Sequence, residues 1–460
     1  MSFGGQRIED RGQRSEVGEI CLLSSVICLL ISGCVMRPVG RGPATELDRV
    51  REQIHLHPGA ALSAGAARVE ITPPVGTPLA GYAKRRGKPS TGIRDPLYVR
   101  TLALSDGEDT LLLISADLLV FPQPLAERIL SKISEENGVP RQGIILAATH
   151  THSGAGSIAT GFLHEQVFGR YQKDIEEGIV SRILWSVRQA LENRKPVQWS
   201  RAAEDSLLGE FVENRALPGG LVDASLSVLL FSAKPGEVKA VVVNAAAHPT
   251  LLDSQDMRFS SDYPGELCRK MEEAYPGAVC LFFNGASGDE RPRDAIGATA
   301  EERVQRFGGL LAEAATALAG RAPLEPKGDL AVWGGWFDLP EPQIWLGPIP
   351  LHPEIGKRMR PTAAFLNMAA LGGTLLVPLP AELTADLGLA LSAKLAEKGN
   401  RSLLLGYANG YLGYAVTPQQ YAAGSYEAGM TWYGADFGRR LENDMLLLAG
   451  LYPDEKTPIE

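Results

Sequence analysis

From Ala67 onward the sequence alternates apolar strand-like runs with amphipathic helix-like runs, and this alternation restricts the chain to few folds. The strand-like runs are short and apolar, whereas the helix-like runs carry apolar residues at three- and four-residue spacing. The pattern predicts a layered α/β sandwich with a mixed, partly parallel sheet. The expected strands are 111–119, 143–148, 224–231, 238–246, 278–283 and 373–377, and the expected helices are 124–136, 174–193, 265–275, 300–319, 382–398 and 436–452.

Composition and charge narrow the class of protein. The chain has 460 residues, of which 45% are hydrophobic and 22% charged, which is typical of a globular protein with a large core. Its net charge is −9 and it has no basic stripe. Because nucleic-acid binding needs a basic surface, we expect no nucleic-acid partner.

The first 34 residues predict an export signal. Ile20–Ile31 is an uncharged apolar run of 12 residues, which is short for a membrane span and typical of a signal-peptide core. It leads into Ile31-Ser32-Gly33-Cys34, which resembles a bacterial lipobox with Cys34 as the lipidated residue. The acidic residues before the run are unusual in a leader and leave open a start downstream of Met1, and an uncleaved anchor is the alternative. We expect an exported protein of the cell envelope or periplasm, associated with the membrane where Cys34 is lipidated.

The remaining chain divides into two predicted parts. Residues 35–64 are rich in Pro, Gly, Ala and Arg and read as a linker with room for one short helix, and residues 65–460 form one domain. This domain keeps two of the five cysteines, Cys268 and Cys280. They can form one disulfide or be buried as small apolar residues.

Polar residues gather after four of the expected strands, and ligands of open α/β sheets bind outside the carboxyl ends of strands. His150 and His152 follow the strand 143–148. In extended backbone both imidazoles point to one side, and imidazole is the commonest zinc ligand. A metal site and a structural histidine bonded to its loop are equally compatible with so short a motif.

The other three strand ends are weaker signals when each is taken alone. His248 follows the strand 238–246, where a lone histidine is usually a core residue, and Pro249 holds it in extended backbone. Glu382 opens the helix 382–398, where the helix dipole favours a carboxylate without any function. The strand 278–283 runs into a charged turn that is either a site or a solvated acidic loop, with Asn284, Ser287, Asp289, Glu290 and Arg291.

A stretch dense in Tyr and Gly covers residues 405–434. It is too irregular for a helix, and a structureless stretch of this length is uncommon in a compact domain unless it is functional. Its tyrosines are either packing aromatics or site residues, namely Tyr407, Tyr411, Tyr414, Tyr421, Tyr426 and Tyr433.

Eight short motifs occur in one order along residues 67–451. They are RVEITPPVGTPLAGYA, the segment 92–98, THTHSGAG, ENRAL, NAAAHPT, NGASGDERP, PAEL and GYANGYLGYAVTPQQYAAGSYE. In this order the chain resembles the N-terminal catalytic domain of the neutral/alkaline non-lysosomal ceramidases.

The resemblance implies a zinc-dependent hydrolase that cleaves an amide bond of a lipid-like or N-acyl substrate by metal-activated water. Zn²⁺ would be held by four residues, His150, His248, Glu382 and Tyr414. Three further residues would serve the reaction: His152 beside the metal, Arg215 in contact with substrate, and Tyr426 polarising the amide carbonyl.

One position departs from the family. Its GDVSPN signature reads GDERPR here, so the family serine is replaced by Arg291, and Ser287 does not align with it. Arg291 is always charged and cannot act as a nucleophile. We expect it to pair with Asp289 or Glu290, with an anionic substrate group as the alternative partner. The replacement keeps two other functions open, a non-catalytic zinc-containing binding lipoprotein and an esterase on the same site.

Overall fold

The computed structural model describes residues 43–452 except 58, 235, 326–327, 347–348 and 351. The predicted leader and Cys34 lie outside these residues. Within the described part, no helix combines the length and hydrophobicity needed to cross a bilayer.

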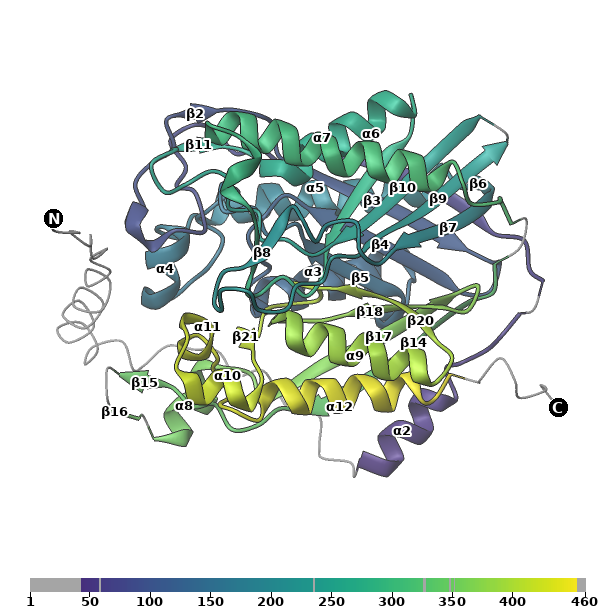
Figure 1. The fold of residues 1–460 in the computed structure, drawn as a ribbon. Helices are drawn as coiled ribbons and strands as arrows, with labels where there is room; N and C mark the ends of the chain where they lie inside the picture. Colours follow the sequence, from purple (N-terminus) through teal and green to yellow (C-terminus); the bar gives the residue numbers. More distant parts are fainter. Residues whose placement is uncertain are drawn as a thin grey trace, which may run out of the picture.

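Three mixed sheets form the centre of the protein (Figure 1). The first has the order β5-β4-β3-β1-β6 and consists of Ile144–Ala148, Thr110–Ala116, Tyr98–Ser105, Ser63–Glu70 and Lys195–Pro196. The second has the order β12-β10-β9-β7 and consists of Val279–Asn284, Glu237–Ala245, Leu226–Lys234 and Gln198–Glu204. The third has the order β14-β17-β18-β20 and consists of Leu330–Asp338, Ala363–Leu371, Thr374–Pro378 and Arg401–Leu405. Each sheet contains one parallel pair, β4 with β5, β10 with β12, and β18 with β20. The predicted mixed α/β class is confirmed.

The inner faces of the three sheets meet in one apolar core. Leu113 of the first sheet, Phe231 of the second and Val332 of the third belong to this single cluster, and each is at most 1% exposed. Burying such a side chain contributes about 1.5–3 kcal/mol. Because both faces of each sheet are covered there, the strands β4, β5, β12 and β18 read as largely continuous apolar runs.

Two long helices cover the outer face of each sheet (Figure 1). In chain order they are α3 Gln123–Asn137 and α5 Lys173–Glu192 on the first sheet, α6 Asp262–Ala274 and α7 Ala300–Ala319 on the second, and α9 Ala385–Glu397 and α12 Phe437–Ala449 on the third. Local signals fix several ends. Thr299 and Glu302 form a capping box at the start of α7, and Gly138 ends α3 in left-handed backbone.

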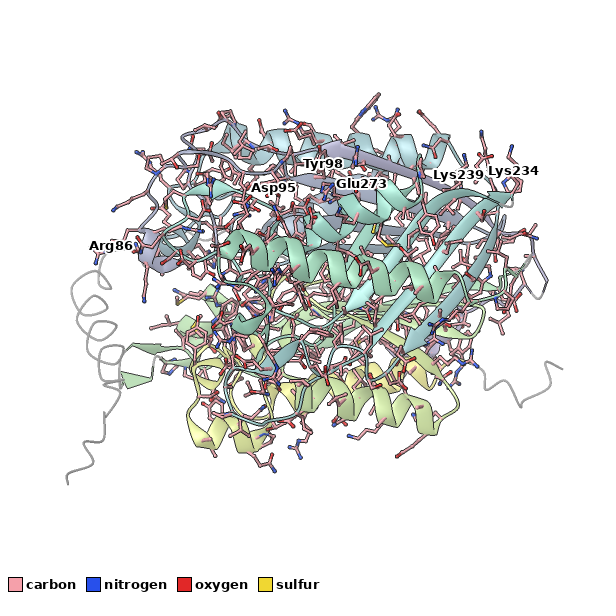
Figure 2. The ribbon with its side chains drawn as sticks, turned by 45° about the horizontal axis from the view of Figure 1, so that its top comes forward. Arg86, Asp95, Tyr98, Lys234, Lys239 and Glu273 are labelled. Atoms are coloured by element: carbon pink, nitrogen blue, oxygen red, sulfur yellow. The ribbon has the colours of Figure 1, made fainter. Side chains whose placement is uncertain are left out.

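Short elements complete the fold, and many of them lie at one end of the molecule, on the left in Figure 1. The short helices are α2 Pro43–Arg51, η1 Ala83–Arg85, η2 Arg141–Gly143, α4 Phe162–Phe168, η3 Asp294–Ile296, α8 Pro353–Met359, α10 Pro418–Ala423 and α11 Tyr426–Gly429. The short strands are β2 Gly92–Ile93, β8 Val212–Asn214, β11 Arg258–Phe259, β13 Glu290–Pro292, β15 Trp345–Leu346, β16 Ile349–Pro350, β19 Glu382–Leu383 and β21 Tyr414–Ala415. Figure 2 shows Arg86 at this end, opposite the β9–β10 hairpin with Lys234 and Lys239.

Two expectations about local structure need comment. Glu382 does not open a helix, because it lies in β19, which pairs with β21, and α9 begins only at Ala385. Its N–H donates to the carbonyl oxygen of Gly413, so this backbone is committed to strand pairing. Cys268 and Cys280 are both free and buried, as in the second of the two alternatives.

The free edge of β5 is closed by the segment that follows β20. Asn409 N–H donates to Leu146 O at 2.7 Å, and the Asn409 side-chain oxygen accepts from Leu146 N–H at 2.8 Å. The Asn409 amide nitrogen donates to the side-chain oxygen of Asn367 in the third sheet at 2.8 Å. Asn409 has φ +60, a left-handed conformation that asparagine tolerates better than most residues. One asparagine therefore joins the first sheet to the third.

We expect Asn409→Ala to lower the free energy of unfolding by about 3 kcal/mol, because it leaves buried backbone groups of β5 unpaired and strains the left-handed residue. Urea denaturation followed by circular dichroism measures the change. The exposed Asn443 on α12 is the matched control, and Asn443→Ala should change stability by less than about 0.5 kcal/mol. Equal stability of the two variants would contradict this role.

Candidate metal centre

Three residues that are far apart in the sequence converge at the carboxyl ends of strands from all three sheets. His150 follows β5, His248 follows β10, and Glu382 lies in β19 after β18. The Nε2 atoms of the two histidines are 3.1 Å apart. Glu382 Oε2 lies 3.4 Å from His150 Nε2 and 3.8 Å from His248 Nε2. All three side chains are at least 96% buried, so water does not compete for these atoms.

The two imidazoles present lone pairs to each other. His150 Nδ1 lies 2.7 Å from Leu119 O, and His248 Nδ1 lies 3.0 Å from Ser287 O. A carbonyl oxygen only accepts, so both Nδ1 atoms carry the hydrogen, and in a neutral imidazole Nε2 is then an acceptor. Burial lowers the pKa of His248 well below its ordinary value and keeps this ring neutral. Two acceptors 3.1 Å apart repel each other unless a cation or a proton lies between them.

Glu382 adds a third acceptor atom, Oε2, which receives no hydrogen bond from the described residues. Its Oε2 is buried and has no hydrogen-bond partner in the described part of the chain, while Oε1 accepts from the Tyr411 hydroxyl at 2.5 Å. Burial raises its pKa, but the proximity of His150 and the hydrogen bonds from Tyr411 and Tyr414 outweigh burial and hold the pKa below its ordinary value. Ligand atoms of tetrahedral zinc lie about 3.4 Å apart, close to the three measured distances. The donor set fits zinc.

His152 lies beside these ligand atoms. Its nearest ring nitrogen lies within 4.8 Å of those of His150 and His248, and neither of its ring nitrogens has a hydrogen-bond partner among the described residues. Burial, with smaller effects of His150, Arg215 and Arg85, lowers its pKa well below the ordinary value. The expected extended backbone is wrong for His150, whose φ is +70, yet the two rings still lie 5.0 Å apart.

Main-chain contacts fix the position of His152. The buried Arg85 guanidinium donates to His152 O and, at 2.8 Å, to Asp256 O, and so ties two loops together. A Cβ atom at Gly81, which has φ +115, would lie 2.8 Å from His152 Cα, so only glycine fits there. The Tyr82 ring lies 4.8 Å from the His152 ring.

Tyr414 and Arg215 extend the centre on the side of Glu382. Tyr414 is directly opposite Glu382 in the β19–β21 pair. Arg215 Nη2 donates to the Tyr414 hydroxyl at 2.9 Å and to Gly288 O at 2.7 Å, and its Nε lies 3.3 Å from a carboxylate oxygen of Glu427. Tyr426 is 65% exposed and its ring centroid lies 6.1 Å from that of Tyr414. The structure therefore places Tyr414 and Arg215 next to Glu382, with Tyr426 exposed beside Tyr414.

Arg291 does not join this group. Its guanidinium lies 2.8 Å from Glu213, its partner across the β8–β13 pair, and 3.7 Å from Asp294. The expected pairing with Asp289 or Glu290 is wrong. Neighbouring side chains of a strand point to opposite faces, so Arg291 points away from Glu290, whereas Asp289 precedes β13 and has partners of its own. The Asp289 carboxylate instead accepts from Ala385 N–H at 2.7 Å, and the Glu290 carboxylate from Asp223 N–H at 2.6 Å.

Two tyrosines support the centre in ways that the sequence did not indicate. The Tyr407 ring stacks on the His150 ring with centroids 3.9 Å apart, and its hydroxyl lies 2.9 Å from Ser287 Oγ. Tyr411 donates to Glu382. The density of tyrosines in residues 405–434 indicated that this stretch is functional, but it did not show that Tyr407 contacts His150 and Tyr411 contacts Glu382.

We expect isothermal titration calorimetry to detect one Zn²⁺ per chain on metal-free protein. His150→Ala and His248→Ala should each weaken Zn²⁺ binding by more than about 100-fold, because each removes a ligand atom. The exposed His352, the N-cap of α8, provides the control, and His352→Ala should bind like the unmodified protein. Undiminished Zn²⁺ affinity in both site variants would refute this centre.

We expect Tyr411→Phe to weaken Zn²⁺ binding by about 10- to 100-fold, because a donor that orients a ligand carboxylate is lost. Tyr421→Phe on α10 is the matched control and should leave the affinity unchanged. Calorimetric titration of both variants measures this effect. Equal affinities would mean that Tyr411 only packs.

Comparisons with known proteins show which proteins the chain resembles. Residues 62–281 match the family model described as neutral/alkaline non-lysosomal ceramidase, N-terminal. The neutral ceramidase of Pseudomonas aeruginosa is 23% identical, over 77% of this chain and 67% of its own length. The crystal structure of neutral ceramidase from Pseudomonas aeruginosa superposes with a TM-score of 0.74 at 20% identity, over 87% of this chain and 76% of its own. A structure described as ceramidase complexed with C2 gives 0.76 at 20% identity, over 87% and 77%. The chain is thus similar to the neutral/alkaline non-lysosomal ceramidases and has the fold of neutral ceramidase, as its ordered motifs predict.

Proposed function

We propose that this protein is a zinc-dependent hydrolase of an amide bond in a lipid-like or N-acyl substrate. The observation that carries the proposal is the convergence of three buried acceptor atoms, from His150, His248 and Glu382, with no donor between them. The relation to the neutral ceramidases supports a ceramidase-like hydrolase. Export and lipid anchoring at Cys34 belong to the same proposal.

The metal would be held by His150, His248, Glu382 and Tyr414. When bound, zinc supplies a Lewis acid that lowers the pKa of water to about 7 and polarises a carbonyl oxygen. The other groups act on the substrate itself. The Tyr426 hydroxyl, exposed beside Tyr414, donates a hydrogen bond to the amide oxygen as negative charge develops on it.

His152 moves the proton. Its ring nitrogens have no partner among the described residues, so one of them is free to accept a proton and to deliver it to the leaving amine nitrogen. Arg215 is held by Gly288 and Glu427 and keeps the Tyr414 hydroxyl in place. No serine is needed, because hydrolysis by water requires only activation of the water and protonation of the leaving group.

Replacement of the family serine favours the second candidate, a non-catalytic zinc-containing binding lipoprotein. Ser287 does not substitute for that serine, because its hydroxyl is fully buried against Tyr407. Cleavage of an ester on the same site is the third candidate. A panel of matched fluorogenic N-acyl amides and esters separates the three.

We expect zinc-loaded protein to hydrolyse the amides, a chelator to abolish turnover, and added Zn²⁺ to restore it. His152→Ala and Tyr426→Phe should each lower kcat by about 10²- to 10⁴-fold with the zinc content unchanged, because they remove proton transfer and oxyanion stabilisation. Tyr421→Phe serves as the control with unchanged kcat. Turnover by metal-free protein would refute the zinc mechanism, and a fully loaded protein inert on the whole panel would indicate the binding protein.

A further inference from the structure

Arg360, the residue after α8, is a half-buried cation without a carboxylate partner among the described residues. Its guanidinium carbon lies 3.5 Å from the centroid of the Trp432 ring. Its Nε is buried and has no hydrogen-bond partner in the described part. Burial lowers its pKa, and among the described residues the hydroxyls of Tyr433 and Tyr411 oppose this effect. A desolvated cation without a counter-charge is costly, so this position favours an anion.

The one polar side-chain partner of Arg360 in the described residues does not neutralise it. Nη1 lies 3.2 Å from His164 Nε2, and His164 Nδ1 lies 2.8 Å from Thr160 O. Nδ1 therefore carries the hydrogen and Nε2 accepts from Arg360. Burial, opposed by the Thr160 hydrogen bond, lowers the pKa of His164, so this ring stays neutral. The other guanidinium N–H groups remain for a ligand.

Two aromatic rings connect Arg360 to the metal centre. The Trp432 ring meets the Tyr411 ring edge-on, with centroids 5.3 Å apart, and the Tyr411 hydroxyl donates to Glu382. Both rings are half-buried, so neither is sealed from solvent. An apolar wall of two rings thus separates Glu382 from the guanidinium.

We propose that Arg360, stacked on Trp432, forms a subsite for an anionic group of the substrate, a carboxylate, sulfate or phosphate. This proposal rests on the proposed amide hydrolysis and names the substrate class. The substrate is an N-acyl compound whose anionic group is separated from the amide by an apolar spacer that crosses Tyr411 and Trp432. The planar guanidinium binds such groups through two parallel hydrogen bonds.

The other two arginines considered for the substrate are already neutralised. Arg215 lies 3.3 Å from Glu427, and Arg291 lies 2.8 Å from Glu213. Arg360 has no such partner in the described chain. An incoming anion therefore meets Arg360 without displacing an internal carboxylate, whereas Arg85 is buried and is held by carbonyl oxygens.

The first test compares N-acyl compounds that end in a carboxylate with their uncharged methyl esters, at several spacer lengths. We expect the amide of the carboxylates to be cleaved with about 10- to 100-fold higher kcat/KM at one optimal spacer. Arg360→Gln should remove this preference through KM and leave the methyl esters unaffected. Arg358→Gln, an exposed neighbour with the same charge change, should behave like the unmodified protein. If Arg360→Gln lowered kcat/KM equally on both substrate types, Arg360 would only stabilise the local structure, and the subsite would be overturned.

The second test does not need turnover. Inorganic phosphate is titrated into metal-free protein, and we expect binding that is weakened at least 10-fold in Arg360→Gln and retained in Arg358→Gln. Arg360-dependent phosphate binding without amide cleavage would support the subsite and contradict the proposed reaction. The subsite alone would be contradicted if the protein cleaved amides without an Arg360-dependent charge preference and if Arg360→Gln bound phosphate as the unmodified protein does.

Discussion

The pairing of the β5 edge with residues 407–409 is the contact on which the candidate site depends. β5 ends the first sheet and carries His150 and His152 at its carboxyl end, and residues 407–409 belong to the segment that continues to Tyr411 and Tyr414. Ala148 N–H donates to Tyr407 O, and the Asn409 side chain occupies the strand's free N–H at Leu146. An unpaired strand edge exposes N–H and C=O groups and promotes aggregation. Here those groups of β5 pair with the segment that carries Tyr407, Tyr411 and Tyr414.

Three sheets around one core explain why the ligands meet. Each sheet has a single parallel pair, and the residues that follow one strand of each pair, β5, β10 and β18, meet at the same end of the molecule. Rigid packing then holds the acceptors of His150, His248 and Glu382 together against their mutual repulsion. A cation bound between these acceptor atoms would remove this repulsion. The same reasoning applies to the uncompensated charge of Arg360.

Charge compensation also distinguishes the arginines. The sequence motifs drew attention to Arg291, but its side chain lies against Glu213 of the neighbouring strand β8 and is 42% exposed. Arg360 gave no signal in the sequence, since it follows a short helix and precedes a proline like many surface arginines. Only its neighbours, Trp432 and His164, make its charge unusual.

The sequence by itself determined the α/β class, the principal strands and helices, and the strand ends where polar residues accumulate, because periodicity and strand-end chemistry are local properties. It could also mark His150, His248 and Glu382 as candidates. Tertiary structure decided the left-handed backbone of His150, the strand pairing of Glu382, the donor role of Tyr411 and the partner of Arg291. Each of these depends on a hydrogen bond or contact with a segment distant in sequence, and such partners are chosen by packing, which no local pattern encodes.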